Sequence, residues 1–273
     1  ACMLTFYPEF TADFDPQQEV IYLIDMSNSM KGQSARDAKK VFLLSLTKLP
    51  DQSSFNVVTF GTTFKELFPS PQVKSKTAVE KAIAFVQAAE PSQGGTVVVT
   101  LLQSLSLLCP PEGSRSLILI SDGHMTSVDD TLTLVRKMNS QNRIFTSGVG
   151  PTVNQHLMKT LATSGGGTYQ YYNNKSKSNW QSKIEGQTER ACQPGVSDVC
   201  VQWIYHAVNK EKVQAPCVIP SLFNGTRQVV YGFVPNCTQA KLSASVDGNE
   251  FTTMVSTTDL NITTGKMLHQ LTA

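Results

Sequence analysis

The first two thirds of the chain alternate between short runs of β-branched residues and longer amphipathic stretches. The run VIYLID at 20–25 has the length and composition of a buried strand, and in the next stretch apolar residues recur at helical spacing. The alternation continues, with strands expected at 20–25, 55–61, 63–68, 116–123, 143–150 and 167–172, and helices at 34–49, 77–90, 96–108, 131–138, 154–166 and 178–191. Strands separated by helices of about 10–15 residues predict an α/β fold, with a doubly wound, mostly parallel sheet.

Beyond Cys192 the pattern changes to segments in which apolar and polar residues alternate. Strand-like segments follow at 197–207, 214–223, 227–234, 240–255 and 266–273. The Asp247-Gly248 pair inside one of them predicts a hairpin turn. The opening segment 3–10 is also strand-like, and we expect it to join these strands in a smaller, sandwich-like β module.

This pattern predicts an α/β domain inserted into an all-β module. The expected boundaries are a leading strand within 1–18, the α/β domain at 19–190 and the β module at 191–273. The chain starts at Ala1, without an initiator methionine or a signal region, so we expect a piece of a longer protein.

Composition then narrows the classes of function. The apolar runs are only as long as strands, whereas a membrane helix needs about 18 apolar residues. Lysine and arginine number 23 and the acidic residues 21, a net charge of +2 that gives no support to electrostatic binding of nucleic acid. We therefore expect no membrane span and no direct nucleic-acid contact.

The cysteines are even in number but widely spaced. They are Cys2, Cys109, Cys192, Cys200, Cys217 and Cys237. No CxxC pair is present, so zinc ligation is poorly supported, and we expect free thiols in a reducing compartment. Four Asn-x-Ser/Thr triplets, at Asn174, Asn224, Asn236 and Asn261, would fit secretion but also arise by chance.

The residues best suited to chemistry follow the ends of predicted strands. Asp25-Met-Ser27-Asn-Ser29 begins at the last residue of the first strand, and Asp122 stands at the end of the strand run SLILIS, directly before Gly123. Thr96 follows two glycines, which would let the backbone fold over the same edge of the sheet. Two carboxylates and three hydroxyls are hard oxygen donors, so this set predicts Mg²⁺ or Mn²⁺.

This set of residues resembles the metal-ion-dependent adhesion site of von Willebrand factor A domains. The family motif combines Asp-x-Ser-x-Ser with a distant threonine and an aspartate in a later strand-end loop. The resemblance covers about 19–190 and implies a Rossmann-like fold. The implied metal ligands are Asp25, Ser27, Ser29, Thr96 and Asp122. It further implies a protein partner that offers an acidic side chain to the metal.

Other segments, across nearly the whole chain, resemble a second family. They are ACMLTFYPEF at 1–10, FKELF at 64–68, ISDGH at 120–124, VYGF at 230–233, CTQA at 237–240 and TMVSTT at 253–258. These segments are similar to the vault-associated poly(ADP-ribose) polymerases. That resemblance implies a cytoplasmic and nuclear protein that associates with the vault particle. It also implies an NAD-dependent ADP-ribosyltransferase domain elsewhere in the parent protein, and no catalytic residue in this chain.

These residues and the glycine motifs also allow other interpretations. Without metal, the strand-end serines and aspartates would act only as caps. A haloacid-dehalogenase-type phosphatase would need a second aspartate where Ser27 stands. Gly148-Val-Gly150 lacks the third glycine of a dinucleotide loop, and the glycines at 165–167 lack the lysine of a phosphate loop. His124 could line the metal face or be an exposed loop histidine.

Three hypotheses of different classes result. The first is a binding module that presents a divalent cation to an acidic group of a protein partner. The second is a metal-independent structural scaffold within the vault particle or the parent polypeptide. The third, a fragment that contributes to ADP-ribosylation, lacks any recognisable NAD site, and we expect no enzymatic activity from this chain.

Overall fold

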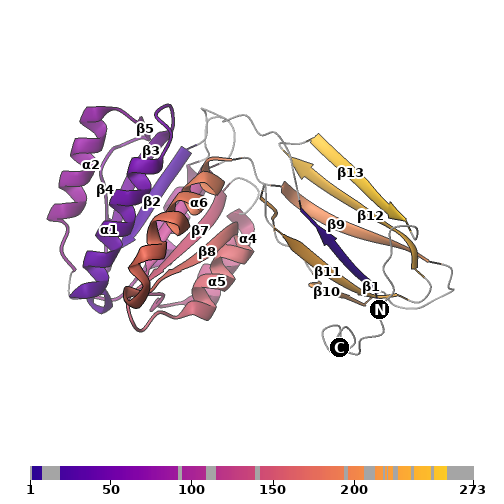
Figure 1. Ribbon diagram of the computed structural model, residues 1–273. Helices are drawn as coiled ribbons and strands as arrows, with labels where there is room; N and C mark the ends of the chain where they lie inside the picture. Colours follow the sequence, from indigo (N-terminus) through magenta and orange to yellow (C-terminus); the bar gives the residue numbers. More distant parts are fainter. Residues whose placement is uncertain are drawn as a thin grey trace. The chain divides into compact units, whose positions relative to one another are not determined.

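The computed structural model of the chain contains two compact units (Figure 1). The described residues are 2–7, 19–91, 94–108, 115–138, 142–193, 196–205, 213–217, 219, 221–223, 227–234, 237–246 and 249–256. One unit, called the α/β unit below, is Asp13–Gln193, and the other, the β unit, combines Ala1–Ala12 with Pro194–Ala273. Cys109 and the predicted strand at 266–273 lie outside the described residues.

A seven-stranded sheet forms the centre of the α/β unit. Its strands are β2 (Glu19–Asp25), β3 (Ser54–Phe60), β4 (Phe64–Glu66), β5 (Gln72–Val73), β6 (Arg115–Ser121), β7 (Asn142–Val149) and β8 (Gly166–Tyr172). They are ordered β4-β3-β2-β6-β7-β8, and β5 also pairs with β3. The pairs among β3, β2, β6, β7 and β8 are parallel, whereas β4 and β5 run antiparallel to β3.

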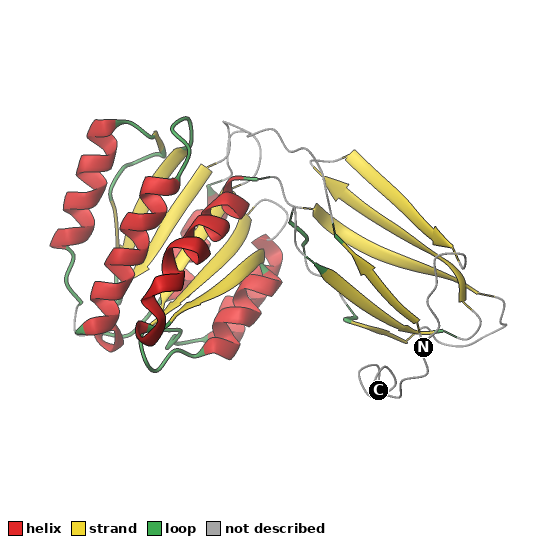
Figure 2. Ribbon diagram, viewed as in Figure 1, coloured by secondary structure: helices red, strands yellow, loops and turns green. Residues whose placement is uncertain are grey.

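Helices cover both faces of this sheet (Figure 2). They are α1 (Gln33–Lys48), α2 (Lys76–Ala88), α3 (Val98–Leu107), α4 (Val128–Met138), α5 (Gln155–Ser164) and α6 (Trp180–Cys192), with short 3-10 helices η1 (Asn28–Met30) and η2 (Asn174–Asn179). Within the described residues, no helix is both long enough and apolar enough to span a membrane.

Neighbouring residues of β2 show how the sheet is buried on both faces. Ile21 and Leu23 belong to a core cluster that also contains buried residues of α3, α4 and α5. Tyr22 points to the opposite face, because side chains alternate along a strand. Its ring packs edge-on against Phe42 of α1 with ring centroids 5.1 Å apart, and its hydroxyl lies 3.0 Å from that of Ser45. The predicted fold class, a doubly wound and mostly parallel α/β sheet, is therefore confirmed.

The β unit contains two antiparallel sheets of three strands each. The first has the order β1-β11-β10 and the second β13-β12-β9. The strands are β1 (Cys2–Phe6), β9 (Val196–Tyr205), β10 (Val213–Ala215), β11 (Gln228–Phe233), β12 (Cys237–Val246) and β13 (Asn249–Ser256). Both sheets contribute to one core cluster, which includes Leu4, Val201, Trp203 and Val230.

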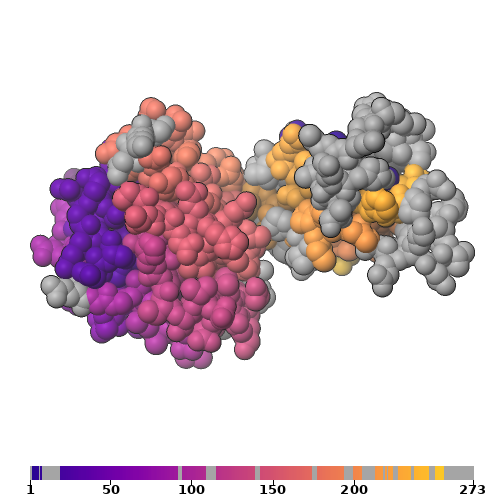
Figure 3. All heavy atoms as spheres, turned by 90° about the horizontal axis from the view of Figure 1, so that it is seen from below, coloured from indigo at the N-terminus to yellow at the C-terminus, as the bar shows by residue number. Residues whose placement is uncertain are grey.

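Segments far apart in the sequence meet in this unit. The first strand pairs with β11 over five residues, from Cys2 opposite Gly232 to Phe6 opposite Gln228. In Figure 3, indigo atoms from the start of the chain accordingly lie among the orange and yellow atoms of the C-terminal strands. The predicted strand at 214–223 was too long: β10 ends at Ala215, because Pro216 has no amide hydrogen for the ladder.

Deleting residues 2–7 is expected to loosen the β unit and leave the α/β unit intact. The deletion removes the pairing partner of β11 and the side chain of Leu4, which is buried in the core cluster. Loss of a buried leucine alone costs about 2–5 kcal/mol. Hydrogen exchange should show faster exchange of the amides of β11 and unchanged protection in β2 and β6. Faster exchange confined to the α/β unit would contradict this assignment of the first strand.

Candidate metal centre

Asp25 and Asp122 lie at the same edge of the sheet because β2 and β6 are parallel neighbours. The register of the two strands aligns Ile24 with Ile120, so both strands end at the same level. Asp25 is the last residue of β2, and Asp122 directly follows the last residue of β6. Loops at the carboxyl ends of parallel strands are where open α/β sheets bind ligands.

Hydrogen bonds hold three loops together at this edge. The amide of Asn28, between Ser27 and Ser29, donates to the carbonyl of Gly94 at 3.3 Å. The amide and the hydroxyl of Thr126 both donate to the carbonyl of Thr96, at 3.3 and 3.1 Å. The loop after β2 and the loop after β6 therefore both contact the segment 94–96, which brings together the three loops that carry the predicted ligands.

The glycine before this segment has a steric role. A Cβ on Gly94 would lie 1.8 Å from Oγ1 of Thr62, so a larger residue would push the loop away. Helix α3 begins only at Val98, two residues later than predicted, and Thr96 belongs to the loop. The close approach of Gly94 to Thr62 gives one physical reason for glycine at this position.

Asp25 is fully buried, and both of its carboxylate oxygens accept hydrogen bonds. The amide of Ser27 donates to Oδ1 at 2.8 Å, and the hydroxyl of Ser121 donates to Oδ2 at 2.6 Å. Burial raises the pKa of Asp25 from 3.8 to about 6. The hydrogen bonds from Ser121 and Ser27 limit this rise, and the negative charge of Asp122 adds to it.

Three hydroxyl groups complete the set of oxygen atoms. The hydroxyl oxygens of Ser27 and Ser29 lie 3.1 Å apart, at the start of the 3-10 helix η1. Ser27 and Thr96 are buried, at 1 % and 3 % exposure, whereas Ser29 is exposed. The centre is therefore closed toward the sheet and open to solvent at Ser29.

The hydrogen bonding of the buried Asp122 carboxylate indicates whether a cation would fit at this site. The carboxylate is 1 % exposed; Oδ1 accepts a hydrogen bond from the amide of His124 at 3.0 Å, but Oδ2 has no partner among the described residues. A buried anionic oxygen without a partner costs free energy. A cation beside Asp25 and Asp122 would remove that cost, and the oxygen-only donor set suits Mg²⁺ or Mn²⁺. Within the described residues, no three His, Cys, Asp or Glu side chains form a metal-binding group, so this candidate depends on hydroxyls.

Ser121 is the residue of this centre that sequence reasoning missed. Its hydroxyl donates to Asp25 and accepts a hydrogen bond from the amide of Gly123 at 3.0 Å. One hydroxyl therefore links the end of β2 to the turn that carries Asp122. The available signal was the position of Ser121 immediately before Asp122, but the strand order that places it beside Asp25 is not written in the local sequence.

Replacing Ser121 with alanine is expected to weaken divalent-cation binding about tenfold, because Asp25 loses a charge-assisted hydrogen bond that holds Oδ2. Isothermal titration with Mn²⁺ would measure the change in Kd. Ser116→Ala is the matched control: Ser116 lies on the same strand and is equally buried, but its hydroxyl donates to the carbonyl of Ala191. Equal Kd values for wild type and S121A would contradict the role of Ser121.

His124 connects the site to the next loop. Its side chain is exposed, and Nε2 lies 2.8 Å from the carbonyl oxygen of Thr152. The amide of Asn154 donates to the carbonyl of Asp122 at 2.9 Å. Two contacts thus hold the Asp122 loop against the segment that precedes α5.

The other glycine motifs have structural roles. Gly165 follows the last residue of α5, and its amide donates to the carbonyl of Leu161, as expected for a helix stop. A Cβ on Gly167 would lie 2.3 Å from the carbonyl oxygen of Ile144, so this glycine permits the close pairing of β8 with β7. The interpretation of 165–167 as a helix stop, and not as a phosphate loop, agrees with these contacts.

A comparison with family models agrees with the fold. Residues 18–171, more than half of the chain, match the model of the von Willebrand factor type A domain. The chain belongs to the von Willebrand factor type A domain family. We call 18–171 the A-domain region below.

Curated relatives match over the whole chain or most of it. Protein mono-ADP-ribosyltransferase PARP4 is 44% identical over 277 residues in Mus musculus and 42% identical over 279 residues in Homo sapiens, covering 100% of this chain in both cases. The human von Willebrand factor A domain-containing protein 5B1 is 34% identical over 217 residues, 79% of this chain and 18% of that protein. The chain spans only 14% and 16% of the two PARP4 proteins. The expected resemblance to the vault-associated ADP-ribosyltransferases is confirmed, and these relatives are named as mono-ADP-ribosyltransferases.

Solved structures show the same fold at low sequence identity. A von Willebrand factor type A protein from Catenulispora acidiphila superposes with a TM-score of 0.64 at 13% identity, covering 93% of this chain and 68% of that one. Manganese-loaded TRAP protein of Plasmodium vivax superposes with a TM-score of 0.51 at 14% identity, covering 93% and 98% of the two chains. At these identities the similarity establishes the fold alone.

Proposed function

We propose that this chain is a cation-dependent protein-interaction module. Mg²⁺ or Mn²⁺ would be held by Asp25 and Asp122 together with the hydroxyls of Ser27, Ser29 and Thr96. The observation that carries the proposal is the buried Oδ2 of Asp122, which has no partner among the described residues and lies at the same sheet edge as the buried carboxylate of Asp25. When bound, the cation would supply positive charge at the surface of an otherwise acidic site.

The exposure of Ser29 favours a partner that approaches the cation from solvent. Mg²⁺ keeps exchangeable positions in its octahedral coordination, and an aspartate or glutamate of a partner could occupy one of them. The manganese-loaded TRAP protein supports the idea that this fold can hold such an ion. No catalytic role is proposed for the residues of this chain.

The relatives suggest the setting in which the module works. Identity of 42–44% across the chain supports a parent protein of the PARP4 type, with its NAD-dependent ADP-ribosyltransferase domain outside this chain. We propose that the parent associates with the vault particle in cytoplasm and nucleus and that vault components are among its protein partners. The proposed parts are the leading strand in 1–18, the A domain at 19–190 and the β module at 191–273.

One observation favours a second candidate, a metal-independent scaffold. Both oxygens of Asp25 already accept hydrogen bonds from Ser27 and Ser121. One of the two proposed carboxylate ligands therefore has hydrogen-bond partners without a cation. In this alternative the A domain would pack within the parent polypeptide or the vault particle, and chelation of metal would change nothing.

A pull-down under two ionic conditions separates the candidates. The immobilised chain is incubated with cell extract in Mg²⁺ or in EDTA, and retained proteins are quantified by mass spectrometry. The proposal expects proteins that are retained in Mg²⁺, released by EDTA and lost with Asp25→Asn. Asp129→Asn, which changes an exposed carboxylate of α4, is the matched control and should retain them. Equal retention in EDTA would favour the scaffold.

A further inference from the structure

Cys2 and Cys237 come together in the β unit although they are 235 positions apart in the sequence. Cys2 lies on β1 opposite Gly232 of β11, and its thiol donates to the carbonyl of Val234 at 3.9 Å. Cys237 follows Val234 by three residues and begins β12, opposite Tyr205 of β9. The pairing of β1 with β11 therefore brings the first cysteine beside the start of β12.

The two side chains meet between the sheets of the β unit. Each packs, partly buried, against the core cluster formed by both sheets. Cys2 donates to the carbonyl of Val234, three residues before Cys237, and it is close enough to Cys237 to raise the pKa of that thiol. Because β1 and β12 belong to different sheets, this contact links one sheet to the other.

We propose that Cys2 and Cys237 are a redox modification site, at which a small-molecule disulfide such as oxidised glutathione converts two thiols into a disulfide between the sheets. Both cysteines are free thiols in the structure, as are the other described cysteines. The inference is independent of the proposed cation site, because it concerns a different unit of the chain.

The reaction proceeds by two thiol–disulfide exchanges. The thiolate of Cys2 attacks one sulfur of oxidised glutathione, which forms a mixed disulfide and releases one glutathione that takes up the proton of Cys2. The thiolate of Cys237 then attacks the sulfur of Cys2, which releases the second glutathione with the proton of Cys237. The two cysteines are oxidised, and one glutathione disulfide is reduced to two thiols.

The environment of Cys237 favours this order of attack. Burial and the neighbouring Cys2 raise the pKa of Cys237 to about 11, so little thiolate is present for a first encounter in solution. The second exchange is intramolecular, and the high effective concentration of the adjacent thiol compensates for the small thiolate fraction.

The disulfide would join the first strand to the C-terminal sheet covalently. While the two cysteines are reduced, β1 is held in the β unit by its pairing with β11 and by the buried side chain of Leu4. A link from Cys2 to Cys237 would close a ring containing the whole α/β unit, which restricts the unfolded chain. Oxidation would therefore stabilise the β unit without changing its fold.

Mass spectrometry of the wild-type chain tests the proposal directly. The chain is equilibrated in oxidised glutathione, remaining thiols are alkylated, and the protein is digested without reduction. The expected result is a Cys2–Cys237 cross-linked peptide in most molecules, lost on reduction. The melting temperature of the β unit should rise by at least about 8 °C on oxidation.

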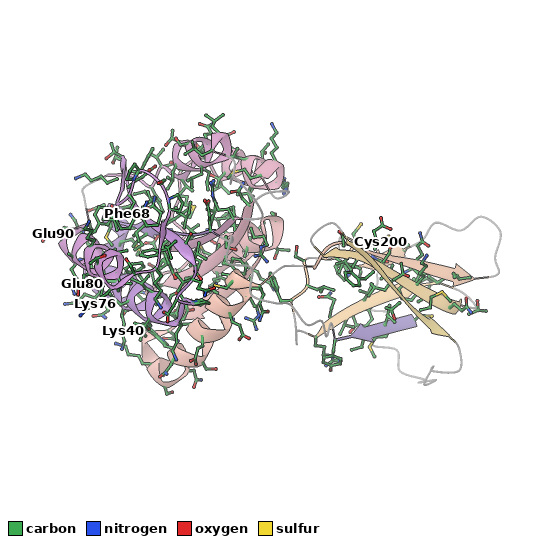
Figure 4. The ribbon with its side chains drawn as sticks, turned by 90° about the horizontal axis from the view of Figure 1, so that it is seen from above. Lys40, Phe68, Lys76, Glu80, Glu90 and Cys200 are labelled. Carbon is green, nitrogen blue, oxygen red and sulfur yellow. The ribbon has the colours of Figure 1, made fainter. Side chains whose placement is uncertain are left out.

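Two variants show whether the pairing is specific. Cys237→Ser should abolish the cross-link and the rise in melting temperature. Cys200→Ser is the matched control, because Cys200 is an exposed cysteine on β9 of the same unit, and it should keep both effects (Figure 4). Glutathione attached to Cys200 while Cys2 and Cys237 remain free, or a disulfide between any other pair, would overturn the proposal.

Discussion

Replacing Asp25 with asparagine is expected to abolish stabilisation by Mg²⁺ and, in the same protein, to raise stability without metal at neutral pH. Binding of a cation at ten times its Kd stabilises the wild type by about 1.4 kcal/mol, and the variant should show no such gain. Without metal, the raised pKa of Asp25 means that folding favours its protonated form. At neutral pH the charged carboxylate therefore costs the wild type roughly 2–3 kcal/mol, which the neutral amide avoids.

The difference in stability between the wild type and Asp25→Asn should depend on pH. Protonated Asp25 contributes to the free energy of unfolding. This contribution is fully present below the unfolded pKa of 3.8 and is lost as the pH rises through the folded-state pKa of about 6. In EDTA, the wild type should lose stability relative to Asp25→Asn between about pH 4 and about pH 7, and Mg²⁺ should reduce the difference at the higher pH. Chemical denaturation at both pH values, with and without metal, measures the free energy of unfolding of both proteins.

Asp129→Asn provides the control, since this exposed carboxylate on α4 belongs to no predicted ligand set. It should leave both the Mg²⁺ effect and the pH profile unchanged. A wild-type chain that gains no stability from millimolar Mg²⁺ or Mn²⁺ would remove the basis for a cation-dependent module, and the scaffold would take its place.

Arg115→Met is expected to cause the largest loss of stability, about 3–5 kcal/mol. Arg115 begins β6, and its Nε donates to the carboxylate of Glu19 at 2.9 Å; the side chains are only 5% and 10% exposed. The guanidinium also donates to the carbonyls of Leu105 and Leu108 at the end of α3. Removing it leaves the charge of Glu19 buried without its partner, and urea denaturation would record the loss.

Two comparisons separate the buried charge from other effects. The double variant Arg115→Met/Glu19→Gln should recover much of the stability, because no unpaired charge remains. Lys48→Met breaks the ion pair between Lys48 and Glu185, whose side chains are 36% and 48% exposed, and should cost less than about 1 kcal/mol. Equal losses for Arg115→Met and Lys48→Met would show that burial of the Glu19 pair is unimportant.

The sequence by itself determined the features that depend on near neighbours. Periodicity of apolar residues predicted the helices and strands of the α/β unit, because burial of one face or both imposes that period locally. The positions of Asp25, Ser27, Ser29 and Asp122 at or just after the ends of strands were readable for the same reason. Their role as metal ligands stays a prediction.

Only the tertiary structure decided which of these local elements meet. The order β3-β2-β6 sets Asp25 beside Ser121, and the pairing of β1 with β11 sets Cys2 beside Cys237. Strand order and register come from the packing of side chains on both faces of a sheet, which involves residues far apart in the chain. The buried, unpartnered oxygen of Asp122 likewise arises only when β6 is enclosed by its neighbours, so no local pattern could have shown it.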